Sequence, residues 1–242
     1  MKKKFLILKI FILLALSVYF ILNIKKIVNT FLGWGTNTLN LNAGLSVILL
    51  AIFVKLLLMP LTQKDNFNDK KKKIIESQIK NVKEKYDKET GKKKIKDIYQ
   101  YYEINSFSIT GCISSIFQLI ITIGIFQSIR GSSIFSNVTF LGLNLDERSP
   151  YFILPILIVF IMGMNFYQTD VRPNKKSAIL FLVILILIFS AIIFVPNALL
   201  LYWLTNSIFT LFQNILALQS AKKYVSSKSE FFSSRAINNN NS

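Results

Sequence analysis

One lysine lies inside an otherwise apolar run, and it is the most unusual potential functional group in this sequence. Lys55 is the only charged residue between Ala43 and Thr62. A lysine at the centre of a membrane helix costs about 2.5–3.5 kcal/mol on insertion scales. One interpretation is a side chain that reaches toward the nearer interface and has no further role. The other is a lysine that faces a water-filled cavity, where it would attract an acidic or polar segment.

Uncharged polar residues at helical spacing favour the cavity. Residues three or four positions apart share one face of a helix, and three such groups lie in apolar runs. They are Ser114, Gln118 and Thr122; Asn165 and Gln168; and Tyr202, Asn206, Thr210 and Gln213. Polar stripes in membrane helices often serve only helix–helix hydrogen bonding, worth roughly 0.6 kcal/mol each. Three stripes together with a lysine predict a hydrated groove.

The composition excludes most catalytic chemistry. The chain has no histidine, which rules out a Ser-His-Asp triad, a Cys-His pair and a His-ligated metal. A single cysteine, Cys112, excludes an internal disulfide and any zinc site that needs several thiolates. We therefore expect no enzyme activity, no metal and no cofactor.

The elements that must position these residues are membrane helices. The chain has 242 residues, of which 52% are hydrophobic, yet its formal net charge is +17. Since a spanning helix needs about 20 apolar residues, the apolar runs predict an all-α polytopic membrane protein. Its core would be five helices, with a cytoplasmic helical hairpin and an N-terminal signal-anchor or signal peptide at residues 1–24. The predicted core helices cover residues 43–62, 106–129, 149–169, 177–195 and 197–221.

The charges set the predicted orientation. Lysine and arginine gather on the cytoplasmic side of membrane proteins. With a cytoplasmic N-terminus, the hairpin at 63–105, the loop at 170–176 and the tail at 222–242 all carry their positive charge inside. The linker at 25–42 and the loop at 130–148 then lie outside. We expect the Asn-rich tail to be disordered, and both termini to be cytoplasmic if the first segment is uncleaved.

The polar insert at 63–105 shows a thin apolar seam. Ile75, Ile79 and Val82 follow a helical spacing, and the same spacing resumes at Ile95 after Thr90-Gly91, where we expect the turn. The insert is either a solvated spacer or an arm that contacts a partner or lipid headgroups.

The order of these features resembles the YidC/Oxa/Alb membrane protein insertases. Five motifs over roughly residues 43–220 carry the resemblance: Val54–Thr62 with its single basic residue and Pro-Leu, Glu84-Lys85-Tyr86, Thr110-Gly111-Cys112 with Gln118, Ser149–Pro155, and Pro196–Asn206. The chain departs from the family pattern in three ways. The family usually has arginine where this chain has Lys55, so the charge is kept but the bidentate fork is lost. Two prolines common around the second core helix are absent, and so is the large extracytoplasmic domain of some members.

The resemblance implies a function without nucleotide hydrolysis. A polar groove open to cytoplasm and lipid would insert nascent membrane proteins and help them fold, with Lys55 attracting the substrate. The groove residues implied are Lys55, Gln118, Thr122, Asn165, Gln168, Tyr202, Trp203 and Asn206. The partners implied are nascent membrane proteins, membrane lipids, the ribosome and the Sec translocon, but not DNA. The location implied is a bacterial inner or plasma membrane.

Two other functions are consistent with the sequence. A membrane assembly factor would bind one partner through its cytoplasmic hairpin and insert nothing. A small transporter is less well supported, because the predicted spans contain no Asp, Glu or His and no inverted repeat is visible.

Overall fold

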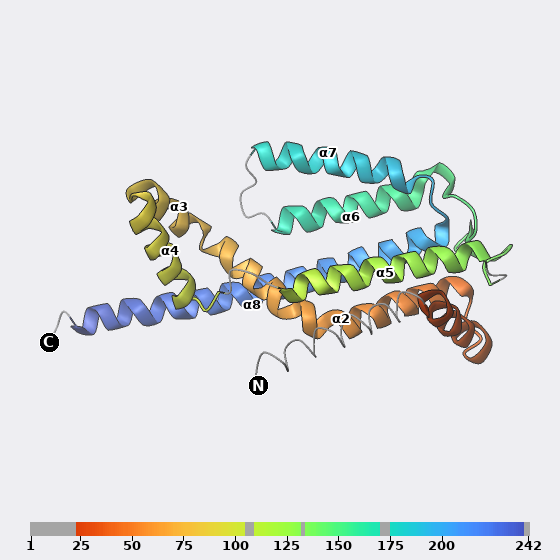
Figure 1. Ribbon diagram of the computed structural model, residues 1–242, viewed down its shortest axis with the longest axis horizontal. Helices are drawn as coiled ribbons and strands as arrows, with labels where there is room; N and C mark the ends of the chain where they lie inside the picture. Colours follow the sequence, from red (N-terminus) through yellow and green to blue (C-terminus); the bar gives the residue numbers. More distant parts are fainter. Residues whose placement is uncertain (1–22, 105–108, 132–133, 170–174, 240–242) are drawn as a thin grey trace, which may run out of the picture. The chain divides into compact units, whose positions relative to one another are not determined.

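Helices make up most of the structure, a computed structural model that describes residues 23–104, 109–131, 134–169 and 175–239 (Figure 1). The predicted N-terminal segment 1–24 lies almost wholly outside the described residues. Residues 23–33 are helical and lead into a short π-helix, η1 (Trp34–Thr38). The later helices are α2 (Ala43–Ile74), α3 (Glu76–Lys85), α4 (Lys88–Tyr101), α5 (Ile109–Gly131), α6 (Ile153–Thr169), α7 (Lys175–Ile192) and α8 (Asn197–Asn239). The predicted all-α class is confirmed.

Among the described residues, two helices are long and apolar enough to cross a membrane by length and composition. The qualifying stretches are Ala43–Pro60 in α2 and Asn197–Ser229 in α8. Three shorter apolar stretches, Gln118–Ser128, Ile153–Tyr167 and Ala178–Ile192, belong to α5, α6 and α7. Each of these stretches overlaps one of the five segments that the sequence predicts as a core helix.

The chain forms two compact units. The described residues of the first unit lie within positions 1–54, 115–157 and 189–205, and those of the second within 55–114, 158–188 and 206–242. The unit boundaries fall inside helices, so α2, α5, α6, α7 and α8 each contribute one segment to each unit.

In the first unit, a small β-hairpin contacts the beginning of α2 and the beginning of α8. Strands β1 (Thr139–Phe140) and β2 (Leu143–Asn144) pair antiparallel through a two-residue loop in which Leu141 and Gly142 both have positive φ. This is the turn geometry that matches the twist of paired strands. Asn197, at the start of α8, donates from its side chain to the Asn144 carbonyl at 2.7 Å. Gly44 of α2 lies directly under the Phe140 ring, where a Cβ would clash. The predicted outer loop is thus an ordered cap on the ends of α2 and α8.

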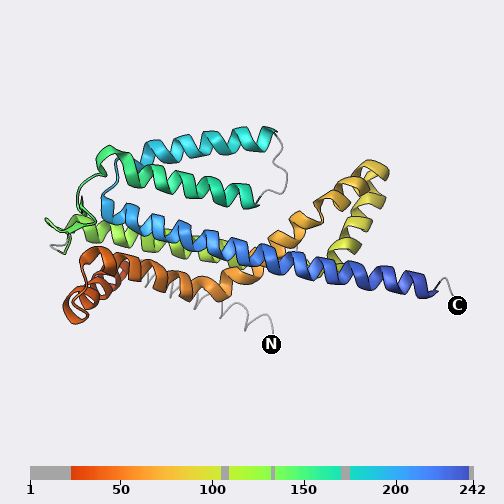
Figure 2. The same ribbon diagram turned by 180° about the vertical axis from the view of Figure 1, so that it is seen from behind.

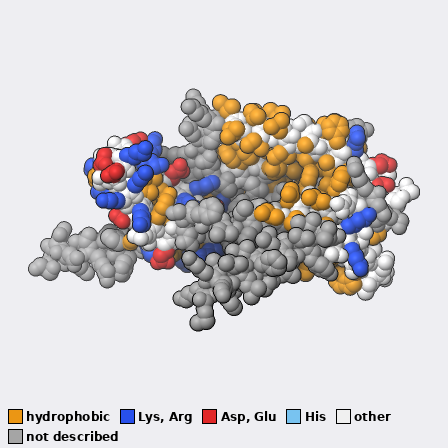
Figure 3. Space-filling view, in the orientation of Figure 1, with side chains coloured by type: hydrophobic (Ala, Val, Ile, Leu, Met, Phe, Trp, Pro, Cys, Tyr) orange, Lys and Arg blue, Asp and Glu red, His pale blue; other side chains and the backbone are white. Residues whose placement is uncertain are grey.

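Apolar side chains cover the surface of α6 and α7, which run side by side in both views (Figures 1 and 2). Within the second unit, Phe166 of α6 stacks on Phe181 of α7 with ring centroids 3.7 Å apart. Leu180 and Leu187 of α7 are each 62% exposed. Figure 3 shows this apolar surface, and it shows lysines and acids gathered over the α3–α4 hairpin instead. Such an apolar surface is typical of helices that face lipid.

Three boundaries differ from the sequence predictions. The predicted linker 25–42 is helical over much of its length, through residue 33 and η1. The hairpin turn lies at Tyr86–Asp87 and not at Thr90-Gly91, because the Asp87 carboxylate caps α4 by accepting the backbone N–H groups of Glu89 and Thr90.

The tail predicted to be disordered from 222 onward is helical through Asn239. Its first turns are stabilised by packing, since Val225 of α8 is buried in an apolar cluster with Ile75, Ile79, Tyr102 and Ile104. Tertiary burial of this kind overrides a weak local propensity.

The position of the hairpin turn leads to a prediction about Asp87. Hydrogen bonds from the Thr90 side chain and backbone hold the pKa of Asp87 below its usual value. The cap is therefore present above the ordinary aspartate pKa and is lost as pH falls through the lowered value. We expect Asp87→Ala to speed hydrogen exchange at the Glu89 and Thr90 amides severalfold at neutral pH, and Asp87→Asn to keep most of the protection. Unchanged exchange in Asp87→Ala would contradict the assigned cap.

Candidate functional site

Lys55 lies in the second unit and has a hydroxyl partner on α8. Its Nζ donates to Thr210 Oγ1 at 2.9 Å, and that hydroxyl in turn donates to the Asn206 carbonyl at 2.8 Å. The lysine side chain is only partly exposed, and apolar residues of α2 flank it in the sequence. The ammonium is therefore held beside a polar stripe of α8.

Asn206 lies one turn before Thr210 on α8, and it is 3% exposed. Neither atom of its side-chain amide has a hydrogen-bond partner among the described residues. A buried amide without a partner costs roughly 1–3 kcal/mol, whereas a buried water bridges such groups at little cost. The Asn206 amide is thus suited to contact water or an entering polar group.

Asn214 continues the stripe two turns beyond Asn206 and joins it to α6. Its Nδ2 donates to Asn165 Oδ1 at 2.9 Å, and Asn165 Nδ2 donates to the Ser207 carbonyl at 3.2 Å. We call Lys55, Thr210, Asn206, Asn214 and Asn165 the polar cluster. Its members come from α2, α6 and α8, and all belong to the second unit.

The other predicted groove residues are not members of the polar cluster. Gln118 and Thr122 belong to the first unit, where the Thr122 hydroxyl donates to the Gln118 carbonyl of its own helix at 2.9 Å. Tyr202 is fully buried and Trp203 is half-buried, also in the first unit. The side chain of Gln168 lies outside the described part of the structure. Of the eight predicted residues, the second unit gathers Lys55, Asn165 and Asn206 into the polar cluster.

The stripe on α8 departs from its predicted spacing. The sequence interpretation continued from Asn206 and Thr210 to Gln213, but the structure places Asn214 in the cluster and Gln213 in a cavity beside α2. At about 100° per residue, Gln213 lies about 20° from Asn206 around the helix and Asn214 about 80°. The spacing alone therefore favours Gln213, and it is the contact with Asn165 of α6 that identifies Asn214.

A second polar group, which sequence reasoning missed, fixes the base of the α3–α4 hairpin. Lys71 of α2 is 3% exposed and donates from Nζ to the carbonyls of Tyr102 and Glu103 at 3.0 and 2.9 Å. Its ammonium also lies 4.9 Å from the Phe67 ring centroid and 5.0 Å from that of Tyr224. Burial lowers the pKa of Lys71.

Lys228 of α8 also bonds to the chain at the end of α4, at Tyr101 and Glu103. Its Nζ donates to Glu103 Oε1 at 2.8 Å and to the Tyr101 carbonyl at 2.7 Å, while the Tyr101 hydroxyl donates to the Lys228 carbonyl at 2.8 Å. The hydrogen bond between Lys228 and Glu103 lowers the pKa of the carboxyl and raises the pKa of the lysine. We call Lys71, Tyr101, Glu103 and Lys228 the hairpin clamp.

The polar cluster offers hydrogen bonding and one positive charge to a bound group. It contains no carboxylate, and its one side-chain hydroxyl, that of Thr210, accepts from the Lys55 ammonium and donates to a backbone carbonyl. Among the described residues, no three His, Cys, Asp or Glu side chains gather to hold a metal ion. What this arrangement can do is lower the free energy of a polar segment brought among apolar helices.

A helical membrane protein with a polar cluster and a clamped hairpin is the class that these observations define. A family model described as 60Kd inner membrane protein matches residues 34–224. The chain belongs to this family, the YidC/Oxa/Alb membrane proteins.

Relatives from several bacteria resemble the chain over most of its length. It is 31% identical over 190 residues to the membrane protein insertase YidC 2 of Listeria innocua, covering 76% of this chain and 66% of the relative. It is 30% identical over 184 residues to the insertase MisCA of Bacillus subtilis, covering 72% and 70%. It is 29% identical over 177 residues to the insertase YidC of Fusobacterium nucleatum, covering 71% and 84%. The match therefore spans slightly less than two thirds of the Listeria protein.

The unpartnered amide in the polar cluster gives a stability prediction. Asn206→Leu should raise the melting temperature of the purified protein by about 2–4 °C, because it removes a buried amide without a described partner at a cost of about 1 kcal/mol. Asn214→Leu is the matched control and should lower the melting temperature, since it leaves Asn165 Oδ1 without its donor. Scanning calorimetry measures both. A similar loss of stability in the two variants would mean that the Asn206 amide has hydrogen-bond partners in the folded protein.

The hairpin clamp predicts how α8 restrains the hairpin. We would place spin labels at Lys88 and Lys222, both exposed, in a Cys112→Ser background and measure their distance distribution by electron paramagnetic resonance. Lys228→Ala should broaden this distribution, whereas Lys228→Arg should keep it narrow. Because the pKa of Glu103 is lowered in the fold, the restraint is present at neutral pH and is lost as pH falls through that value.

Lys223→Ala serves as the control for this measurement, because Lys223 is exposed on the same helix and outside the clamp. Equal broadening in the Lys223 and Lys228 variants would show that helix charge alone, and not the clamp, orders the hairpin.

Proposed function

We propose that this protein is a membrane protein insertase of the bacterial cell membrane, working without nucleotide hydrolysis or covalent chemistry. The single observation that carries the proposal is the polar cluster, in which the Lys55 ammonium is bonded to Thr210 beside the buried amide of Asn206. The named function of the relatives supports it. The substrates are nascent membrane proteins.

The cluster would act by replacing water around a polar substrate segment. A peptide group that enters lipid without partners costs several kcal/mol. Lys55, Thr210 and Asn206 supply a charge, a hydroxyl and an amide in one place, so part of that cost is recovered during transfer. The apolar surface of α6 and α7 then offers the substrate helix an exit into lipid. Gln118, Thr122, Gln168, Tyr202 and Trp203 remain proposed groove residues.

The charges of the chain support a cytoplasmic location for the hairpin and for the end of α8. Lysines on both segments suit contacts with lipid headgroups or with ribosomal RNA. We propose the ribosome and a Sec translocon as working partners on the same basis, with both chain termini in the cytoplasm if the first segment is retained.

Three substitutions of Lys55 test the electrostatic part of this mechanism. Lys55→Arg should preserve insertion, because it keeps the charge. Lys55→Ala and Lys55→Met should each impair the insertion of substrates with polar outer segments severalfold, although methionine keeps most of the apolar stem. Insertion is measured as protease-protected product, both in a depletion strain and in liposomes that hold only this protein.

Lys25→Ala is the control, since Lys25 is exposed and lies outside the polar cluster. Full insertion by Lys55→Met would exclude an electrostatic role for Lys55. If the wild-type protein gave no protected product in liposomes, the assembly-factor function would replace the insertase function.

A further inference from the structure

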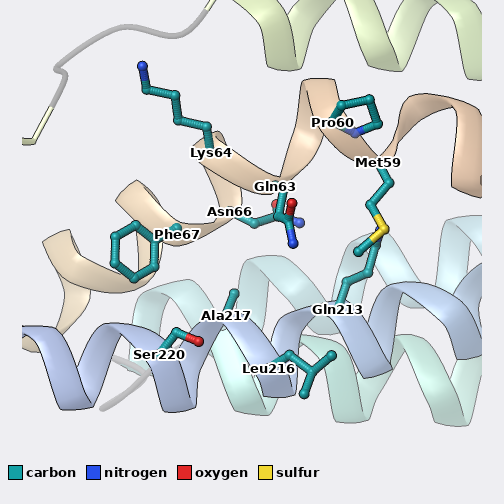
Figure 4. Close-up of a pocket in the computed structure, with 10 residues that line it drawn as sticks. All are labelled: Met59, Pro60, Gln63, Lys64, Asn66, Phe67, Gln213, Leu216, Ala217 and Ser220. Carbon is teal, nitrogen blue, oxygen red and sulfur yellow. The ribbon is translucent and has the colours of Figure 1, made fainter.

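A cavity of about 400 Å³ lies between α2 and α8 within the second unit (Figure 4). Met59, Pro60, Phe67 and Leu216 form its apolar lining. In the close-up view, the Met59 side chain extends from α2 toward α8, and Leu216 comes from the facing part of α8. The cavity is separate from the polar cluster, because none of the five cluster residues lines it.

The rest of the lining consists of hydrogen-bonding groups. Gln63, Asn66 and Gln213 contribute amides and Ser220 contributes a hydroxyl, and Gln63 and Asn66 point from α2 toward α8 (Figure 4). Amide N–H and hydroxyl groups donate to phosphate oxygens. None of the residues that line the cavity carries a carboxylate, so an anion would meet no like charge on its walls.

Two lysines make the surroundings positive. Lys64 belongs to the lining and is exposed, and in the close-up its side chain extends from α2 away from α8 (Figure 4). Lys71 lies 4.9 Å from the centroid of the Phe67 ring, which is part of the wall. Lys71 bonds to backbone carbonyls, which leave its positive charge in place. Both positive charges would attract an anion bound in the cavity.

The cavity begins where the apolar stretch of α2 ends. The spanning stretch is Ala43–Pro60, and the lining of the cavity on α2 runs from Met59 to Phe67. In a bilayer this is the depth at which acyl chains give way to headgroups. Basic pockets between helices on the cytoplasmic side are the usual form of anionic lipid sites.

We propose that this cavity binds an anionic phospholipid, with the phosphate among Gln63, Gln213 and Ser220, Lys64 at the rim, and the start of an acyl chain against Met59 and Leu216. The juxtaposition of donors, positive charge and apolar lining at headgroup depth selects phosphatidylglycerol over phosphatidylcholine, because the choline group would place a second positive charge beside Lys64. The site is independent of the proposed insertion mechanism and requires only that α2 crosses the membrane.

Native mass spectrometry of the purified full-length protein with added dioleoyl phosphatidylglycerol or dioleoyl phosphatidylcholine tests the site. We expect one phosphatidylglycerol to bind more tightly than phosphatidylcholine. Lys64→Gln should lower the affinity for phosphatidylglycerol about fivefold, as expected for one lysine near a headgroup. It should leave the affinity for phosphatidylcholine unchanged. Ala217→Phe, which fills the cavity, should remove the tight site.

The matched control is Lys223→Gln, because Lys223 is an exposed lysine of α8 that does not line the cavity. It should leave the affinity for phosphatidylglycerol unchanged. Equal affinity for the two lipids, or equal weakening by the Lys64 and Lys223 variants, would overturn the proposal, since either result indicates diffuse surface charge. Equally tight binding of glycerol 3-phosphate alone would overturn the assignment to a lipid. None of these outcomes depends on whether the protein inserts substrates.

Discussion

The hydrogen bond between Lys55 and Thr210 sets the main constraint on the second unit. A lysine among apolar residues is tolerated only where its ammonium finds polar partners or water. The structure meets this requirement with one face of α8, where a hydroxyl lies 2.9 Å from the ammonium and a buried amide follows one turn away. Folding alone would favour an apolar residue at position 206. The buried asparagine is therefore a cost to stability, which a contact with water or with the polar segment of the proposed mechanism would offset.

Much of the architecture follows from simple patterns in the sequence. Apolar runs interrupted by one lysine are enough to predict the all-α class and to single out Lys55. The helix face is harder to choose, because adjacent residues such as Gln213 and Asn214 lie about 100° apart around a helix. The rotation of α8 against its neighbours decides whether Gln213 or Asn214 points toward α6. A single sequence carries that information only weakly. The spacing from Asn206 favours Gln213, so only the packing of α8 against α6 identifies Asn214.

The α3–α4 hairpin shows a second limit of prediction from sequence. Thr90-Gly91 resembles a turn in composition, yet Gly91 lies inside α4 because Asp87 caps the helix one turn earlier. A local cap can be identified from sequence by the residue that precedes the helix. The clamp cannot, since Lys228 and Glu103 are 125 residues apart and pair only after α8 extends beyond the apolar core. The helical tail has the same origin, in burial of Val225 against the hairpin.

One helix connects the two polar groups of the second unit. Thr210 of the polar cluster and Lys228 of the clamp both lie on α8, and 18 residues of continuous helix between them span about 27 Å. A continuous helix moves as a rigid element unless a proline, a glycine pair or an inserted group bends it, and this stretch contains neither proline nor glycine. The hairpin therefore cannot tilt as a whole while the clamp is closed unless it also displaces α8 at Thr210. Opening the clamp would therefore free the hairpin from the helix that carries Thr210, the hydrogen-bond partner of Lys55.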